Sequence, residues 1–268
     1  MWKRLIACLL PFVLWQLWGA PFRLDWLAFP VGAACGVALW VVAFVAEQEW
    51  GRTTWLAKLR SPRLSCGLLA LTVCASVVGG CGWTAIFTSW PFVALVALLL
   101  AQLTLLMVHR AARFSWRRDT CFFLLHGGFW LALLSGSVGA ADASELRVVL
   151  KSDAAETQAY DTEGRLHGLP YRLQLEEFQV ETHASEGTPV QYTATLLLDE
   201  HPIRLAVNAP YAVSWCEDLY LMSYQANPAS GRVESCLLML VREPWKNSLL
   251  LGILLLLAGV GVLLFKLK

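Results

Sequence analysis

Six long stretches of apolar residues constrain the fold of this chain more than any other feature. They cover approximately residues 5–20, 30–46, 66–88, 90–108, 120–141 and 247–265. A helix needs about 20 mostly apolar residues to cross a bilayer. Only 15% of the residues are charged and 57% are hydrophobic, whereas a typical soluble domain has about 25% charged residues. The sequence therefore predicts a membrane protein built on a bundle of about six transmembrane helices.

The first stretch has two interpretations. It is short and contains Pro11 and Gln16, and its Trp-Lys-Arg start, with Ala20 near its end, is also typical of a cleaved signal peptide. Because several further apolar stretches follow, we expect a first span here. The signal peptide is the alternative.

The charged residues between the stretches predict which side of the membrane each segment occupies. The two ends of the chain and the loops after the second and fourth stretches together hold twelve Lys and Arg residues and three acidic residues. The remaining segments hold nine basic and seventeen acidic residues, nearly all of them between residues 142 and 246. Basic loops stay on the cytoplasmic side. We therefore expect a protein of the cytoplasmic (inner) membrane with both ends inside and residues 142–246 on the exoplasmic side.

The long hydrophilic segment has the pattern of a β-domain. Short runs in which apolar and polar residues alternate are separated by turn residues such as NAP and NPASG: PYRLQLEEFQVE, QYTATLLLD, HPIRLAVN, LYLMSY and SCLLMLVRE. Alternation with period two and regular turns predicts six or seven antiparallel strands in a small sandwich or barrel. The chain thus divides into spans one to five (1–141), an exoplasmic all-β domain (142–246), and the last span with a short basic tail (247–268).

Two of the eight cysteines, Cys216 and Cys236, lie in the predicted β-domain. An exoplasmic compartment is oxidising, so a structural disulfide between them is the first interpretation. Two free buried thiols, or a redox-active pair, are the alternatives. The chain contains no C-x-x-C motif, and it has no basic run with interleaved aromatic residues of the kind that binds nucleic acid.

His126 is an ionisable residue within the fifth apolar stretch. Such residues are costly in a membrane and are candidates for function, and a neutral imidazole is a good metal ligand. Small residues around it keep the helix thin, which leaves room for a neighbouring helix or for a flat ligand: Gly127, Gly128, Ser135, Gly136, Ser137 and Gly139. A histidine that is hydrogen-bonded to a neighbouring span is the alternative.

Three stretches carry a resemblance to a known family: AFVAEQEWGRTTWLAKL, LLHGGFWLALLSGSVG and LYLMSYQANPASGRVESCLLMLVREPWKNSLLLGILLLLAGVGVLLF. In this order they resemble the ResB-like (CcsB) cytochrome c biogenesis proteins. The first is similar to the family pattern A-x-F-x-E-x-x-(Tyr/Trp)-G-x-x-x-A, the second to the family's histidine-bearing span, and the third to its closing strands and last span. Glu243 stands where the family has an aspartate before Pro244.

The resemblance implies a subunit of the System II cytochrome c biogenesis complex, in which a CcsA-like partner and this chain bring haem across the membrane and attach it to apocytochrome c. His126 would match the axial ligand of haem iron, and the partner would supply the second ligand. The haem would be haem b, transported or transiently bound, and the chain a non-catalytic or co-catalytic subunit of the haem lyase.

Two alternatives to this function come from other classes of protein. One is a membrane scaffold or assembly subunit that docks a partner through its β-domain without binding haem. The other is a thiol-redox membrane protein that uses Cys216 and Cys236.

Overall fold

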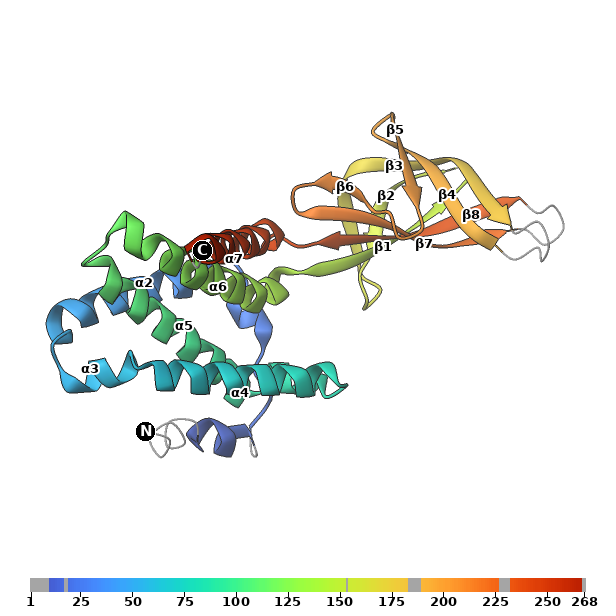
Figure 1. The fold of residues 1–268 in the computed structure, drawn as a ribbon. Helices are drawn as coiled ribbons and strands as arrows, with labels where there is room; N and C mark the ends of the chain where they lie inside the picture. The colour runs from blue at the N-terminus through green and yellow to red at the C-terminus, as the bar shows by residue number, and fades with distance from the viewer. Residues whose placement is uncertain (1–9, 17–18, 153, 183–188, 227–231, 267–268) are drawn as a thin grey trace. The chain divides into compact units, whose positions relative to one another are not determined.

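The structure is a computed structural model that describes residues 10–16, 19–152, 154–182, 189–226 and 232–266. It divides into two compact units, of which one comprises Met1–Ala141 and Trp245–Lys268 and the other comprises Asp142–Pro244. The first unit is helical and the second consists of β-strands (Figure 1). In the chain, the β-unit is inserted directly before the last helix.

Five helices of the first unit are long and apolar enough to cross a membrane: α2 (Val31–Trp50), α4 (Pro62–Gly80), α5 (Trp90–Ala111), α6 (Trp116–Asp142) and α7 (Lys246–Lys266). Many of their exposed side chains are apolar, including Val37, Val42, Leu254 and Leu257. A helix that is apolar on all sides is typical of a membrane span. The first predicted stretch lies partly outside the described residues, so the expected total of about six is not tested.

The third predicted span, residues 66–88, differs from the structure. Helix α4 starts at Pro62, with Ser61 as its N-cap, and ends at Gly80. Gly82 has a φ of +111°, a conformation that glycine adopts at little cost, and the 3₁₀-helix η2 (Thr84–Thr88) follows. The apolar composition continues through this turn, but the glycines break the helix.

The β-unit is one antiparallel sheet of eight strands in the order β5-β4-β3-β2-β1-β8-β7-β6 (Figure 1). The strands are β1 (Ser144–Lys151), β2 (Ala155–Tyr160), β3 (Leu166–Thr182), β4 (Pro189–Leu198), β5 (His201–Ala206), β6 (Tyr211–Ser214), β7 (Glu217–Ala226) and β8 (Val233–Arg242). The predicted antiparallel domain before the last helix is confirmed, with eight strands instead of six or seven.

Alternate residues of the strands form the core of this unit. On β1, Leu146, Val148 and Leu150 are buried, and on the neighbouring β8 Leu238 and Leu240 are buried. Successive side chains of a strand point to opposite faces, so each strand supplies one apolar row. Because β5 also contacts β6 and β7, the sheet curls around these rows. It therefore resembles a barrel more than a two-sheet sandwich.

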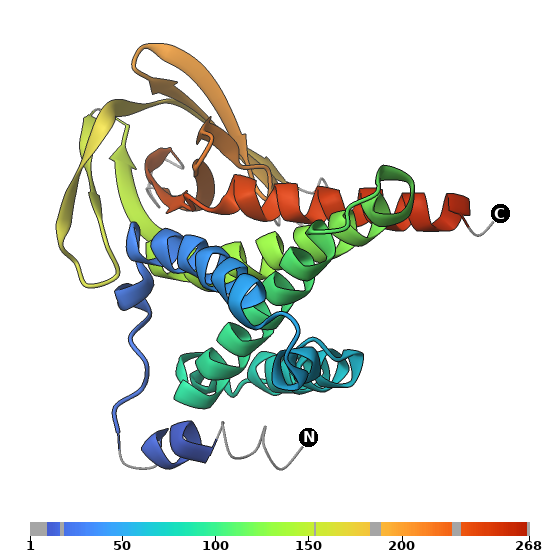
Figure 2. The same cartoon turned by 90° about the vertical axis from the view of Figure 1, so that its left-hand side faces the viewer.

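Helices α6 and α7 approach each other closely through glycines. A Cβ atom at Gly128 would lie 2.7 Å from the carbonyl oxygen of Gly252, and one at Gly252 would lie 2.7 Å from the backbone nitrogen of Ala132. About two turns before Gly128 on α6, the thiol of Cys121 donates to the carbonyl oxygen of Gly259 at 3.4 Å. Figures 1 and 2 both show α7 beside α6. Small residues of this kind allow membrane helices to pack backbone against backbone.

We expect Gly128→Ala to destabilise the helical unit and Gly127→Ala to be tolerated. The added methyl group at position 128 would force α6 and α7 apart, and overpacking of this kind costs about 1–3 kcal/mol. At Gly127 the nearest atom to a Cβ is Met107 Sδ at 4.0 Å. Both variants raise helix propensity equally, so thermal unfolding in detergent isolates the packing effect. Equal stability of the two variants would contradict the close approach.

Candidate functional site

The His126 side chain is held by its own helix. Its Nδ1 atom lies 2.9 Å from the carbonyl oxygen of Phe122, and its ring stacks on the Phe122 ring with 3.9 Å between centroids. A carbonyl oxygen only accepts hydrogen bonds, so Nδ1 carries the proton. The lone pair is therefore on Nε2, which has no hydrogen-bond partner among the described residues. Histidines that ligate metals commonly have this arrangement, with the second nitrogen bonded to a backbone carbonyl.

His126 lines an open groove of about 280 Å³ between α4, α5 and α6. We call it the His126 groove, and its other lining residues are Ser65, Cys66, Leu69, Leu99, Leu103, Leu106, Leu125 and Phe129. Apart from the imidazole, only one hydroxyl and one thiol interrupt the apolar surface. A flat apolar ligand with a metal at its centre would match this lining.

Gly128 does not face the His126 groove. Gly128 faces α7 and serves the helix contact described above. In an α-helix a separation of two residues corresponds to a rotation of about 200°. Since Gly128 faces α7, the side chain of His126 lies on the opposite side of α6, where α4 and α5 form the groove.

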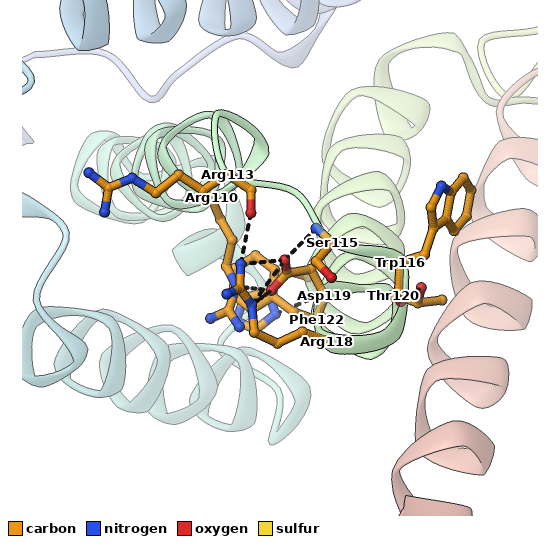
Figure 3. A network of polar contacts seen from close by, with 9 residues as sticks. Arg110, Arg113, Ser115, Trp116, Arg118, Asp119, Thr120 and Phe122 are labelled. Carbon is orange, nitrogen blue, oxygen red and sulfur yellow. Dashed lines mark hydrogen bonds and ion pairs between the residues drawn. The ribbon is translucent and has the colours of Figure 1, made fainter.

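A network of ion pairs lies one to two turns before His126, where α5 turns into α6 (Figure 3). The carboxylate of Asp119 is fully buried and accepts hydrogen bonds from Arg110 Nε at 2.8 Å, Arg118 Nη2 at 2.9 Å and the Ser115 backbone nitrogen at 2.8 Å. The Arg110 guanidinium also lies 4.6 Å from the centre of the Phe122 ring. Phe122 therefore connects this Asp119 network with His126.

A second cluster joins the ends of α2 and α5. Glu47 lies within 2.5 Å of Arg60 Nη1 and 2.7 Å of His109 Nδ1, and Arg60 Nη2 donates to the carbonyl oxygen of Gly51 at 2.8 Å. Sequence reasoning found neither this cluster nor the Asp119 network as a unit. The available signals were acidic residues next to apolar stretches, Glu47 and Asp119, but Arg60 and His109, the partners of Glu47, are distant in sequence.

A larger hollow of about 750 Å³ lies among α2, α5, the second half of α6 and the 3₁₀-helices η1 (Leu24–Leu27) and η2. Its lining has no ionisable residue except Cys35, and the hydroxyl of Ser137 donates to the Leu133 carbonyl oxygen. Within the described part of the chain, no three His, Cys, Asp or Glu side chains form a metal-binding group.

The predicted disulfide between Cys216 and Cys236 does not fit this fold, in which both are free thiols. Cys236 lies within β8, paired with Leu150 and Tyr224, whereas the carbonyl oxygen of Cys216 accepts from the Glu243 nitrogen just beyond the other end of β8. Seven residues of extended chain separate the two places, which corresponds to about 20 Å. A disulfide needs Cα atoms within about 7 Å. The alternating pattern of β8 predicts the strand, but only its pairing shows this separation.

The match with known proteins covers the part of the chain that holds His126 and the β-strands. Residues 115–239 match the sequence model of the ResB-like family. This part of the chain is ResB-like. The resemblance found in the sequence is thus confirmed, and the ResB-like segment includes His126, Asp119 and both β-unit cysteines.

Among solved structures, the chain is similar to one described as Cytochrome c Heme Lyase CcmF, with 17% sequence identity and a TM-score of 0.39. The match covers 76% of this chain and 34% of that protein, so the chain spans about a third of its length. No curated protein matches the chain.

We expect alkylation of the native protein without reductant to modify Cys216 and to leave Cys236 unmodified. Cys236 is 1% exposed, and burial raises the pKa of its thiol to about 12, so it has little of the reactive thiolate. Cys216 is partly exposed. Mass mapping should find Cys236 alkylated only after unfolding, again without reductant. If the peptides that contain Cys216 and Cys236 separate only after reduction, the two residues form a disulfide and this expectation is wrong.

Proposed function

We propose that this chain is a subunit of the System II cytochrome c biogenesis complex that holds haem inside the membrane through His126, while a CcsA-like partner completes the site and haem is attached to apocytochrome c. The observation that carries the proposal is the state of His126. One ring nitrogen is bonded to its own helix, and the other is available beside an apolar groove in a ResB-like segment.

In this proposal haem is the cargo of the protein. The residues of the helical unit can contact one side of it. Haem iron binds imidazole, and the porphyrin is flat and apolar. The His126 groove of about 280 Å³ is slightly below the range of about 300–1,000 Å³ that is usual for pockets which enclose a ligand. The groove would cover one side of the porphyrin, and a partner subunit would cover the rest and supply the second axial ligand.

The charge distribution supports a location in the inner membrane with the β-unit outside. The end of α5, the loop after it and the start of α6 together carry Arg110, Arg113, Arg117 and Arg118, and basic segments between spans remain in the cytoplasm. His126 then lies about 9 Å from the inner boundary at Thr120, at about 1.5 Å per residue. This position suits a histidine that receives haem from the cytoplasmic side.

The alternatives differ in how well the geometry supports them. A thiol-redox function would need Cys216 and Cys236 to meet, and the pairing of β8 keeps them about 20 Å apart. A scaffold subunit without haem needs no imidazole in the membrane. If the experiments below find no haem binding, they favour this scaffold alternative.

We expect protease added to the exoplasmic side of sealed cells to cleave within residues 142–244 and to spare a tag placed after Lys268. The physical reason is that the Lys- and Arg-rich segments between the spans all fall on one side of the membrane, and this side is the cytoplasmic one. Immunoblotting for the tag in a membrane-embedded fragment measures the result. Complete loss of the tag in sealed cells would refute the topology.

We expect His126→Ala to lower the haem that co-purifies with the protein at least severalfold, and added imidazole to restore part of it. The substitution removes the iron ligand and leaves the groove, and alanine is a good helix former, so the amount of protein in the membrane should change little. His109→Ala, which removes a histidine outside the groove, is the matched control. The absorption spectrum of haem measures occupancy.

A structural role of His126 predicts a different pattern. Less protein would reach the membrane, haem per remaining protein would be unchanged, and imidazole would have no effect. Full haem occupancy with an unaltered spectrum in His126→Ala would show that this residue is not the ligand.

A further inference from the structure

One helix that lines the His126 groove, α5, carries a guanidinium group near its end. Leu99, Leu103 and Leu106 line the groove from α5, and Arg110 follows at the next position of the same helical spacing. Residues three or four apart share one face of a helix. Arg110 therefore lies on the face of α5 that forms the groove, at the end nearest the cytoplasm in the topology proposed above.

Arg110 is held in place on two sides. Its Nε atom donates to the fully buried carboxylate of Asp119 at 2.8 Å, and its guanidinium lies over the Phe122 ring at 4.6 Å. Among the described residues, no acceptor is bonded to the two terminal nitrogens of Arg110, and the side chain is 41% exposed. A fixed guanidinium with free N–H groups can bind a carboxylate in two-point fashion with little loss of conformational entropy.

Phe122 connects Arg110 to the proposed iron ligand. One face of its ring is stacked against the imidazole of His126 at 3.9 Å, and Arg110 is positioned over the same ring. From the middle of the membrane toward its inner boundary, the site thus presents apolar leucines, an imidazole, a phenyl ring and a cation. Haem has the complementary order of an apolar ring, a central iron and two carboxylates at one edge.

We propose that Arg110 binds the carboxylate edge of the porphyrin whose iron His126 ligates, with Asp119 and Phe122 holding its guanidinium in position. This inference rests on the function proposed above and specifies which way the porphyrin faces: its carboxylates point to the cytoplasmic boundary. The ligand class is an iron porphyrin with free carboxylates.

The neighbouring arginines differ from Arg110. Arg118 uses Nε and Nη2 on Asp119, and Nη2 also donates to the Arg113 carbonyl oxygen at 2.7 Å. Figure 3 shows the guanidinium of Arg113 directed away from the Asp119 network. Arg113 is therefore the matched control, because its substitution removes the same charge three residues further along the chain.

The test is a titration of the full chain in nanodiscs with haem and with haem dimethyl ester, in which both carboxylates are blocked. A hydrogen-bonded charged pair corresponds to roughly a ten- to hundredfold difference in affinity. We expect wild type to bind haem more tightly than the ester by about this factor. Arg110→Gln should lower the affinity for haem to that for the ester and leave the ester unchanged, and Arg113→Gln should change neither.

Several results would overturn the proposal. An equal loss for haem and ester in Arg110→Gln would mean that Arg110 only supports the fold, and an equal effect of Arg113→Gln would mean general surface charge. If wild type and Arg110→Gln differ in haem affinity only in nanodiscs of phosphatidylglycerol, and not in nanodiscs of phosphatidylcholine, Arg110 binds a lipid headgroup. If wild type binds both porphyrins equally and His126→Ala binds neither, the function stands and this inference fails. If wild type binds neither, both fail.

Discussion

The backbone contact between α6 and α7 determines the arrangement of the site. These two helices come directly before and after the β-unit in the chain. At Gly128 and Gly252 their backbones lie so close that a Cβ atom on either glycine would clash with the other helix. The contact also sets the rotation of α6 about its axis. With Gly128 against α7, His126 must face the other way, toward α4 and α5. A packing requirement thus orients the imidazole.

The polar groups at the N-terminal end of α6 complete this arrangement. A buried carboxylate is stable only when it is paired and hydrogen-bonded, and Asp119 has two guanidinium groups and a backbone N–H. Satisfying Asp119 fixes Arg110 over Phe122, and Phe122 in turn supports the His126 ring. One buried acid therefore positions a series of side chains that ends at the proposed iron ligand.

Much of the fold could be predicted because local patterns determine it. Long apolar stretches predict the helices and alternating residues predict the antiparallel domain, since both depend on nearby residues and on the solvent. The end of α4 at Gly80 was missed because the composition stays apolar through Gly82, whose positive φ closes the helix. The disulfide between Cys216 and Cys236 was predicted although both are free thiols, because spacing along the chain contains no information about strand register.

The sequence by itself determined that His126 lies within an apolar helix next to small residues, and that its segment is ResB-like. It left open which of those glycines serve packing and which face a ligand, because 3.6 residues per turn distributes them around the helix without naming the neighbours. Only the tertiary structure decided that Gly128 faces α7, that His126 faces a groove, and that Arg110 lies over the Phe122 ring that stacks on His126. These facts depend on contacts between α5, α6 and α7, and such contacts are set by the packing of the whole bundle.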